Sequence, residues 1–210
     1  MNSVEPQSNP VPDPRVAFFD QHAPTWDQTG PDPAVTLRRL QELNGQLGMG
    51  PGLDVLEVGC GTGQITGWLA ETVRPGRVVA ADFSRAMLAH ARARPVEAEF
   101  VRLDICEANQ VTRWFDVVLC FHSFPHFRDQ EEALRQIARH LKPAGHLLVV
   151  HLVGSRQLNT FHHRVGGPVG HDHLLPLSQW PGLLRDAGLE LAEAVDREDL
   201  FLVRAHLKAA

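Results

Sequence analysis

Short apolar runs alternate with longer segments of helical spacing along most of the chain. The runs lie at 53–59, 76–83, 98–104, 115–121 and 145–153. They are nearly continuous in apolar residues, and segments between them carry apolar residues at the spacing of one helix face. Buried strands separated by helices are typical of a parallel sheet that is covered on both faces. The pattern therefore predicts an α/β domain with a doubly wound sheet.

The pattern changes at both ends of this alternating region. Before it, residues 15–28 and 32–48 have the spacing of two helices, and no strand precedes them. After it, and beyond a helix near 176–188, the runs 189–196 and 199–208 are joined by a charged turn. This last pair predicts an antiparallel hairpin at the C-terminal end.

These segments define the expected organisation. Residues 1–14 carry four prolines and small polar residues, which predict a flexible tail. Residues 15–210 are expected to form one domain, because their number suits a single core. Within it, we expect a helical cap at 15–50 and a histidine- and glycine-rich insert on the substrate side at 152–176.

Composition and charge limit the classes of partner that we expect the protein to bind. The three cysteines have no short paired spacing, which favours reduced thiols in a cytoplasmic protein. The net charge of −5, without a basic cluster, argues against a nucleic-acid partner. No apolar run approaches the roughly 20 residues that cross a bilayer, and the first residues do not resemble a secretory signal. We therefore expect a small-molecule ligand, no membrane partner, and a monomer or homodimer.

A glycine-rich turn follows the first strand. In the segment VLEVGCGTGQ, Gly59, Gly61 and Gly63 permit a tight turn and let main-chain N–H groups approach a ligand closely. Position 64 is Gln, so the spacing departs from the dinucleotide fingerprint. Asp82 ends the next strand, at the spacing expected for an acid that accepts hydrogen bonds from two ribose hydroxyls.

Five segments together resemble a known family. In order, EVGCGTG, AADFS, VRLDI, FDVVLCFHSFPHF and KPAGHLLVV are similar to the motifs of class I methyltransferases that use S-adenosylmethionine (SAM). The resemblance runs from about residue 16 to the C-terminus. It implies a Rossmann-like sheet of seven strands, mostly parallel with a C-terminal antiparallel hairpin, and an N-terminal helical cap over the cofactor.

The resemblance also implies which residues bind SAM. The three glycines would line its methionine part, and Glu57 would support their loop. Asp82 would hold the ribose with Phe83 against the adenine, whereas Asp104 and Ile105 would meet the adenine amine and face. The cofactor-binding residues that we expect are Glu57, Gly59, Cys60, Gly61, Gly63, Asp82, Phe83, Asp104, Ile105 and Cys120.

Histidines follow the strands where a methyl acceptor would bind. The fourth strand continues into CFHSFPHF, and not into the Asn/Asp-Pro-Pro-aromatic motif with which resembling enzymes methylate planar amines. His122 and His126 lie in this segment, and His151 ends the fifth strand. If these strands are neighbours, His126 and His151 share a cleft, and a short helix from Ser155 could add His162.

Three interpretations of these histidines stay open. His126, His151 and His162 could bind one divalent transition metal (zinc, iron, copper or nickel) that orients and acidifies an acceptor hydroxyl or thiol. Alternatively, His122 or His126 could be the catalytic base of a metal-independent O- or C-methyltransferase. In the third interpretation the histidines only line the pocket. For the chain as a whole, the alternative is a non-catalytic accessory protein that binds SAM or a metal. The sequence favours a SAM-dependent methyltransferase that acts on a small molecule.

Overall fold

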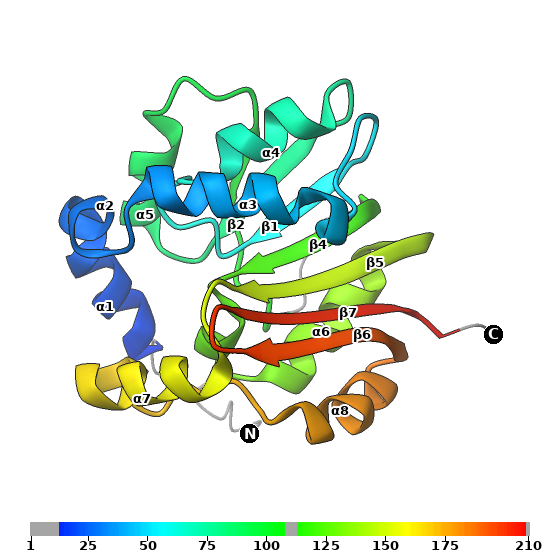
Figure 1. Cartoon of the computed structure of the whole chain (residues 1–210). Coiled ribbons are helices and arrows are strands. Elements are labelled where there is room, and N and C mark those ends of the chain that lie inside the picture. Colours follow the sequence, from blue (N-terminus) through cyan, green and yellow to red (C-terminus); the bar gives the residue numbers. More distant parts are fainter. Residues whose placement is uncertain (1–12, 108–112, 209–210) are drawn as a thin grey trace, which may run out of the picture.

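The computed structural model describes residues 13–107 and 113–208. They contain one seven-stranded sheet with helices around it (Figure 1). Its strand order is β3-β2-β1-β4-β5-β7-β6. All neighbouring pairs are parallel except those of β7, which is antiparallel to both β5 and β6. The strands are β1 Val55–Val58, β2 Val78–Asp82, β3 Glu99–Arg102, β4 Phe115–Phe121, β5 Leu141–His151, β6 Leu189–Arg197 and β7 Leu200–Leu207. The predicted Rossmann-like fold with a C-terminal hairpin is confirmed.

Helices cover both faces of the sheet, as Figure 1 shows. Leu40 of α3 and Leu69 of α4 belong to the core on one face, and Ile137 of α6 and Trp180 of α8 to the core on the other. The helices are α1 Pro14–His22, α2 Trp26–Thr29, α3 Pro33–Leu47, α4 Thr66–Val73, α5 Arg85–Arg92, α6 Gln130–His140, α7 Ser155–Val165 and α8 Trp180–Asp186. Short 3-10 turns lie at Ala23–Thr25, Phe124–His126, Gly167–Val169 and Leu177–Gln179.

The strands are buried on both faces because their apolar residues serve two cores. Along β4, Val118 and Cys120 lie in the core beneath α6 and α8, whereas Val117 and Leu119 lie in the core beneath α3 and α4. This alternation follows from the two-residue period of a strand. A central strand therefore needs apolar residues at successive positions, and the sequence supplies them.

The predicted N-terminal cap divides into two parts with different roles. Helices α1 and α2 lie at the edge of the sheet where the parallel strands end (Figure 1). In contrast, α3 packs on a sheet face through Leu40, Leu43 and Leu47. The predicted cap at 15–50 therefore combines helices at the strand ends with a helix whose apolar stripe buries a face of the sheet.

The described structure begins slightly earlier than the predicted domain. The Asp13 carboxylate accepts a hydrogen bond from the Arg15 N–H at 2.9 Å, and Pro14 is the first residue of α1. Aspartate before a helix and proline at its first position are a common N-terminal arrangement. The prediction of a flexible tail otherwise concerns residues 1–12, which lie outside the described residues.

The predicted insert contains more regular structure than its glycines indicate. Helix α7 occupies Ser155–Val165, and its last residue is followed by Gly166 at φ 67°. After α7 the chain passes α1, where Asp172 contacts Arg15, and then reaches α8. Among residues 13–107 and 113–208, none of the helices combines the length and hydropathy that a bilayer crossing requires.

Candidate functional site

A cavity of about 850 Å³ opens where the parallel strands end. The glycine loop after β1 and the end of β2 form one part of its lining, and the segment after β4 forms another. Helices α1 and α7 supply further lining, and Figure 1 shows both at this edge of the sheet. Open α/β sheets bind ligands at this edge, beside the point where the strand order reverses. Here that point lies between β1 and β4.

The glycine loop is shaped by a close approach between two chain segments. Gly59 has φ 77°, and a Cβ at this position would lie 2.4 Å from the Cβ of Ser123. The Ser123 hydroxyl donates to the carbonyl oxygen of Val58 at 2.6 Å, which holds the segment after β4 against the loop. Glycine is therefore required here by both the backbone conformation and the available space.

Asp82 connects the glycine loop to the end of β2. Its carboxylate accepts hydrogen bonds from the Gly61 and Ser84 N–H groups, both at 2.8 Å. The residue is 6% exposed, and burial raises the pKa of its carboxyl group to about 6. Since each carboxylate oxygen has two lone pairs, one acceptor position on each oxygen remains for a ligand.

Glu57 is a buried acid beneath the same loop. Burial raises the pKa of its carboxyl group to about 8, so the group is protonated at neutral pH. It accepts a hydrogen bond from the hydroxyl of Thr66 at 2.7 Å, which connects β1 to the first residue of α4. This contact links the two elements on either side of the glycine loop.

Two acids that the sequence did not single out attach the cap to the glycine loop and to the segment after β2. Asp27 accepts hydrogen bonds from the Thr62 hydroxyl at 2.5 Å and the Gln64 side chain at 2.8 Å. Asp20 accepts from the Ser84 hydroxyl at 2.5 Å and the Ala86 N–H at 3.1 Å. Single acids on a short helix carry no sequence signal of such a role, because their partners come from distant segments.

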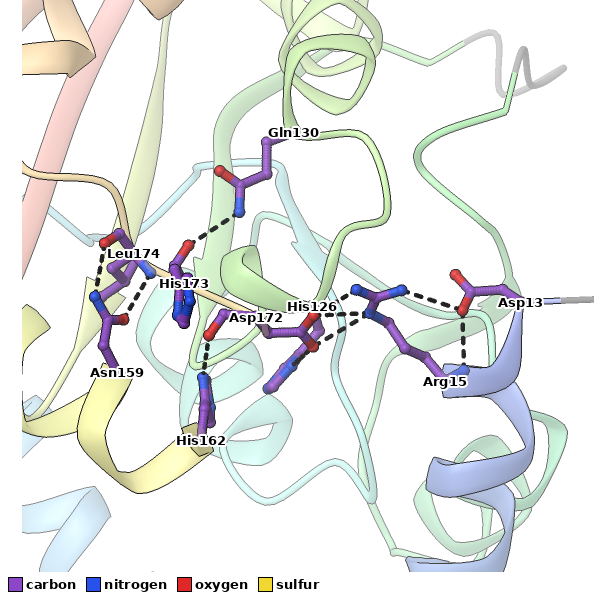
Figure 2. A network of polar contacts seen from close by, with 9 residues as sticks. All are labelled: Asp13, Arg15, His126, Gln130, Asn159, His162, Asp172, His173 and Leu174. Carbon is purple, nitrogen blue, oxygen red and sulfur yellow. Dashed lines mark hydrogen bonds and ion pairs between the residues drawn. The ribbon is translucent and has the colours of Figure 1, made fainter. Parts of the chain in front are cut away.

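His126 is part of a buried polar network that Figure 2 shows. Its Nδ1 lies 2.8 Å from Oδ2 of Asp172, which is 2% exposed. Arg15 donates to the same carboxylate through two nitrogens. Its Nη2 lies 2.5 Å and its Nε 3.0 Å from Oδ1 of Asp172. Burial alone would raise the pKa of Asp172, but hydrogen bonds from His126 and Arg15 outweigh it and leave this pKa below its usual value. Asp172 is therefore a carboxylate.

Helix α7 places a second histidine beside His126. The Nδ1 of His162 lies 2.7 Å from the main-chain oxygen of Asp172, and the ring centroids of His126 and His162 are 4.8 Å apart. Both residues line the cavity, together with His122 and Phe161. We refer to this part, lined by His122, His126, Phe161 and His162, as the acceptor chamber.

The other two predicted histidines, His122 and His151, have different surroundings and do not contact Asp172 in the described structure. Nε2 of His122 accepts a hydrogen bond from the Leu152 N–H at 3.2 Å, and burial lowers the pKa of His122 to about 4. His151 is 1% exposed and does not line the cavity. Its ring lies against those of His122 and Phe201, with 5.0 and 6.3 Å between centroids, and within residues 13–107 and 113–208 neither ring nitrogen has a hydrogen-bond partner. The expectation that His126 and His151 share a cleft is therefore wrong.

The histidines are not arranged as the predicted metal site. Within residues 13–107 and 113–208, no group of three or more His, Cys, Asp or Glu side chains is placed to hold a metal ion. His151 is buried against Phe201 and is not part of the cavity lining, whereas His126 and His162 are. The geometry does not fit the proposed ligand set of His126, His151 and His162.

Most of the predicted cofactor-binding residues line the cavity. They are Glu57, Gly59, Cys60, Gly61, Asp82, Phe83, Asp104 and Ile105. Gly63 instead faces α5, where an added Cβ would lie 3.2 Å from that of Ala91. Cys120 has no exposed surface and lies in the core. We therefore do not assign ligand contacts to Gly63 or Cys120.

Comparisons with known proteins show the family to which the chain belongs. Residues 55–145 match a family model described as methyltransferase domain. Methyltransferase GfsG of Streptomyces halstedii is 30% identical over 200 residues, covering 87% of this chain and 70% of that protein. Malonyl-[acyl-carrier protein] O-methyltransferase 1 of Coxiella burnetii is 32% identical over 154 residues, and the alignment spans 73% of this chain but about half (51%) of that protein.

Solved structures share the fold. The DhpI–SAH complex has a TM-score of 0.72 at 19% identity, covering 93% of this chain and 96% of that one. CcbJ methyltransferase from Streptomyces caelestis has a TM-score of 0.68 at 18% identity, covering 91% of this chain and 98% of that one.

Proposed function

Because this chain belongs to the class I SAM-dependent methyltransferase family, we propose that it transfers the methyl group of SAM to a small-molecule acceptor held beside His126. The observation that carries the proposal is one continuous cavity. It extends from Gly59, Gly61 and Asp82 at one end to His126 and His162 at the other. A donor and an acceptor bound at these two ends would meet within a single enclosed space.

The cofactor end has the features that SAM requires. The approach of Ser123 leaves no space for a side chain at Gly59, which lines the cavity together with Gly61. Asp82 keeps one acceptor position on each oxygen, which suits the two ribose hydroxyls. Phe83 lies in the lining beside Asp82, where it would contact the adenine. Bound SAM supplies an electrophilic methyl group.

His126 is the residue best placed to remove a proton from the acceptor. Its Nδ1–H donates to the Asp172 carboxylate, which leaves Nε2 with a free lone pair. During transfer, the acceptor oxygen or carbon forms a bond to the methyl carbon, the carbon–sulfur bond breaks, and the acceptor's proton moves to Nε2. Arg15 balances the charge of Asp172, so this carboxylate stays ionised while it orients the ring.

His122, the other candidate base, is less suited. Its Nε2 lone pair is already used by the Leu152 N–H, and its pKa of about 4 makes it a weak base at neutral pH. The backbone of His122 has φ 54°, an uncommon conformation for a residue other than glycine. His122 therefore lines the chamber as a neutral group.

The names of the relatives leave the acceptor atom open. They include an O-methyltransferase that acts on a malonyl-carrier protein in Coxiella burnetii and a C-methyltransferase of ubiquinone and menaquinone biosynthesis in Ectopseudomonas mendocina. Our choice of a small acceptor rests on the chamber itself. Apolar side chains such as Leu158 and Phe161 line it beside the histidines, which suits a compact, mainly apolar molecule.

The proposal is tested by following methyl transfer in the full chain. We would measure SAM affinity by calorimetry, and then incubate the protein with SAM and a panel of phenols, alcohols and carbon acids. Mass spectrometry would detect S-adenosylhomocysteine and a product heavier by one CH2 group. His126→Gln should lower kcat by about a hundredfold or more, because general-base catalysis is lost, and should leave SAM affinity unchanged.

The exposed His173 provides a matched control, since its side chain lies outside the cavity lining. His173→Gln should retain the wild-type kcat. Full activity of His126→Gln would overturn the assignment of the base. SAM binding without turnover of any panel member would instead favour a non-catalytic accessory protein.

A further inference from the structure

Each histidine of the acceptor chamber has one ring nitrogen whose role is fixed by its partner. The Asp172 carboxylate and the Asp172 main-chain oxygen can only accept hydrogen bonds, so Nδ1 of His126 and Nδ1 of His162 must donate. The Leu152 N–H can only donate, so Nε2 of His122 must accept. The contacts therefore specify a tautomer for all three rings.

The consequence is a defined hydrogen-bonding pattern. A neutral imidazole has one N–H, so in its neutral form each of the three rings carries that N–H on Nδ1. The Nε2 lone pairs of His126 and His162 then remain for a ligand, with their ring centroids 4.8 Å apart. Burial and the neighbouring His126 lower the pKa of His162, which keeps its ring neutral at neutral pH.

We infer that His126 and His162 present these two lone pairs side by side, and that the chamber thereby selects an uncharged acceptor with two neighbouring hydroxyls. One hydroxyl would donate to Nε2 of His126 and become methylated. The second would donate to Nε2 of His162, which makes His162 a specificity-determining residue. This inference rests on the function proposed above and adds the chemical class of the acceptor.

The charges near the chamber also favour an uncharged acceptor. Asp172 is already paired with Arg15 and His126, and Arg128 in the cavity lining is paired with Asp104. A charged acceptor would lose hydration on entry and would have to compete with these pairs. Phe161 is 59% exposed in the lining, so an apolar body of the acceptor could cover it.

The tautomers can be tested without any acceptor. Long-range ¹H–¹⁵N spectra of protein labelled in its histidines distinguish Nδ1–H from Nε2–H rings, and single His→Gln variants assign the signals. We expect the Nδ1–H form for His122, His126 and His162 in the complex with S-adenosylhomocysteine. An Nε2–H ring at His162 would overturn the inference and leave the proposed methyl transfer untouched, whereas an Nε2–H ring at His126 would also overturn its assignment as the base.

The acceptor class is tested with a matched pair of probes. Catechol carries two neighbouring hydroxyls and phenol one, and calorimetry would measure both against the complex with S-adenosylhomocysteine. Catechol should bind about fivefold more tightly, the effect of one additional hydrogen bond. His162→Gln should reduce this preference, whereas His163→Gln, a change at the exposed neighbour on α7, should preserve it.

The outcomes separate this inference from the function on which it rests. Equal affinities for the two probes, including undetectable binding of both, would overturn the two-hydroxyl preference. A preference that survives in His162→Gln would overturn the role of His162. In both cases, turnover in the acceptor panel and its loss in His126→Gln would still support the proposed methyl transfer.

Discussion

The cofactor end and the acceptor end of the cavity are built in different ways. At the cofactor end, Asp82 reaches the Gly61 N–H across 21 positions of sequence, from one strand end to the next. At the acceptor end, the contact between Arg15 and Asp172 spans 157 positions and joins the first helix to the late insert. The first arrangement follows from a local motif on a parallel sheet, whereas the second depends on how distant segments pack.

This difference explains why the sequence predicts the residues of the cofactor end better than those of the acceptor end. Neighbouring parallel strands end at one edge, so residues that follow them are brought together by the fold itself. The acceptor chamber instead depends on α1 and α7, which the sheet does not position directly. We therefore expect mutations at the two ends to separate cofactor affinity from acceptor chemistry.

The largest expected effect is at Asp82. Asp82→Ala removes the acceptor for two ribose hydroxyls, each worth about 2 kcal/mol as a hydrogen bond to a charged group. SAM affinity measured by calorimetry should fall about a thousandfold. The thermal midpoint should be measured in parallel, because the Gly61 and Ser84 N–H groups also lose their partner. Unchanged affinity would defeat the cofactor assignment.

A smaller effect on catalysis is expected from Asp172→Asn. The amide has nearly the same shape but can donate as well as accept, so it no longer enforces Nδ1–H on His126. We expect kcat to fall by about a hundredfold with SAM affinity unchanged. In part of the molecules, His126 would carry its proton on Nε2 and could not accept the acceptor's proton there. Histidine NMR should show mixed tautomers at His126. A lower kcat with the Nδ1–H form retained would point to a purely structural role.

The smallest effect concerns the pH dependence of SAM binding. The pKa of Asp82 is raised from 3.8 to about 6 by burial, so the carboxyl group becomes protonated below pH 6 and loses one acceptor position. SAM affinity should fall about tenfold for each pH unit below this value. Because the folded chain holds this proton more tightly than the unfolded chain, Asp82 also lowers stability as pH rises from 3.8 to about 6. Asp82→Asn should show neither dependence.

Strand periodicity would have corrected two of the site predictions, those for His151 and Cys120. His151 shares its face of β5 with Leu147 and Val149, and Cys120 shares its face of β4 with Val118. These positions alternate with those that face α3 and α4, so counting in steps of two would have placed both side chains toward the core under α6 and α8. Proximity to a strand end was not enough to place a side chain in the cavity.

The sequence alone determined the order of strands and helices along the chain, the glycine loop, the acid at the end of β2 and the presence of histidines after β4. Each of these depends on local spacing or on apolar periodicity, which one chain segment carries by itself. Tertiary structure decided that Asp172 would meet His126 and Arg15, and that α1 and α7 would both line the cavity. Such contacts depend on packing between segments far apart in sequence, and no local pattern records which of several polar side chains will be buried together.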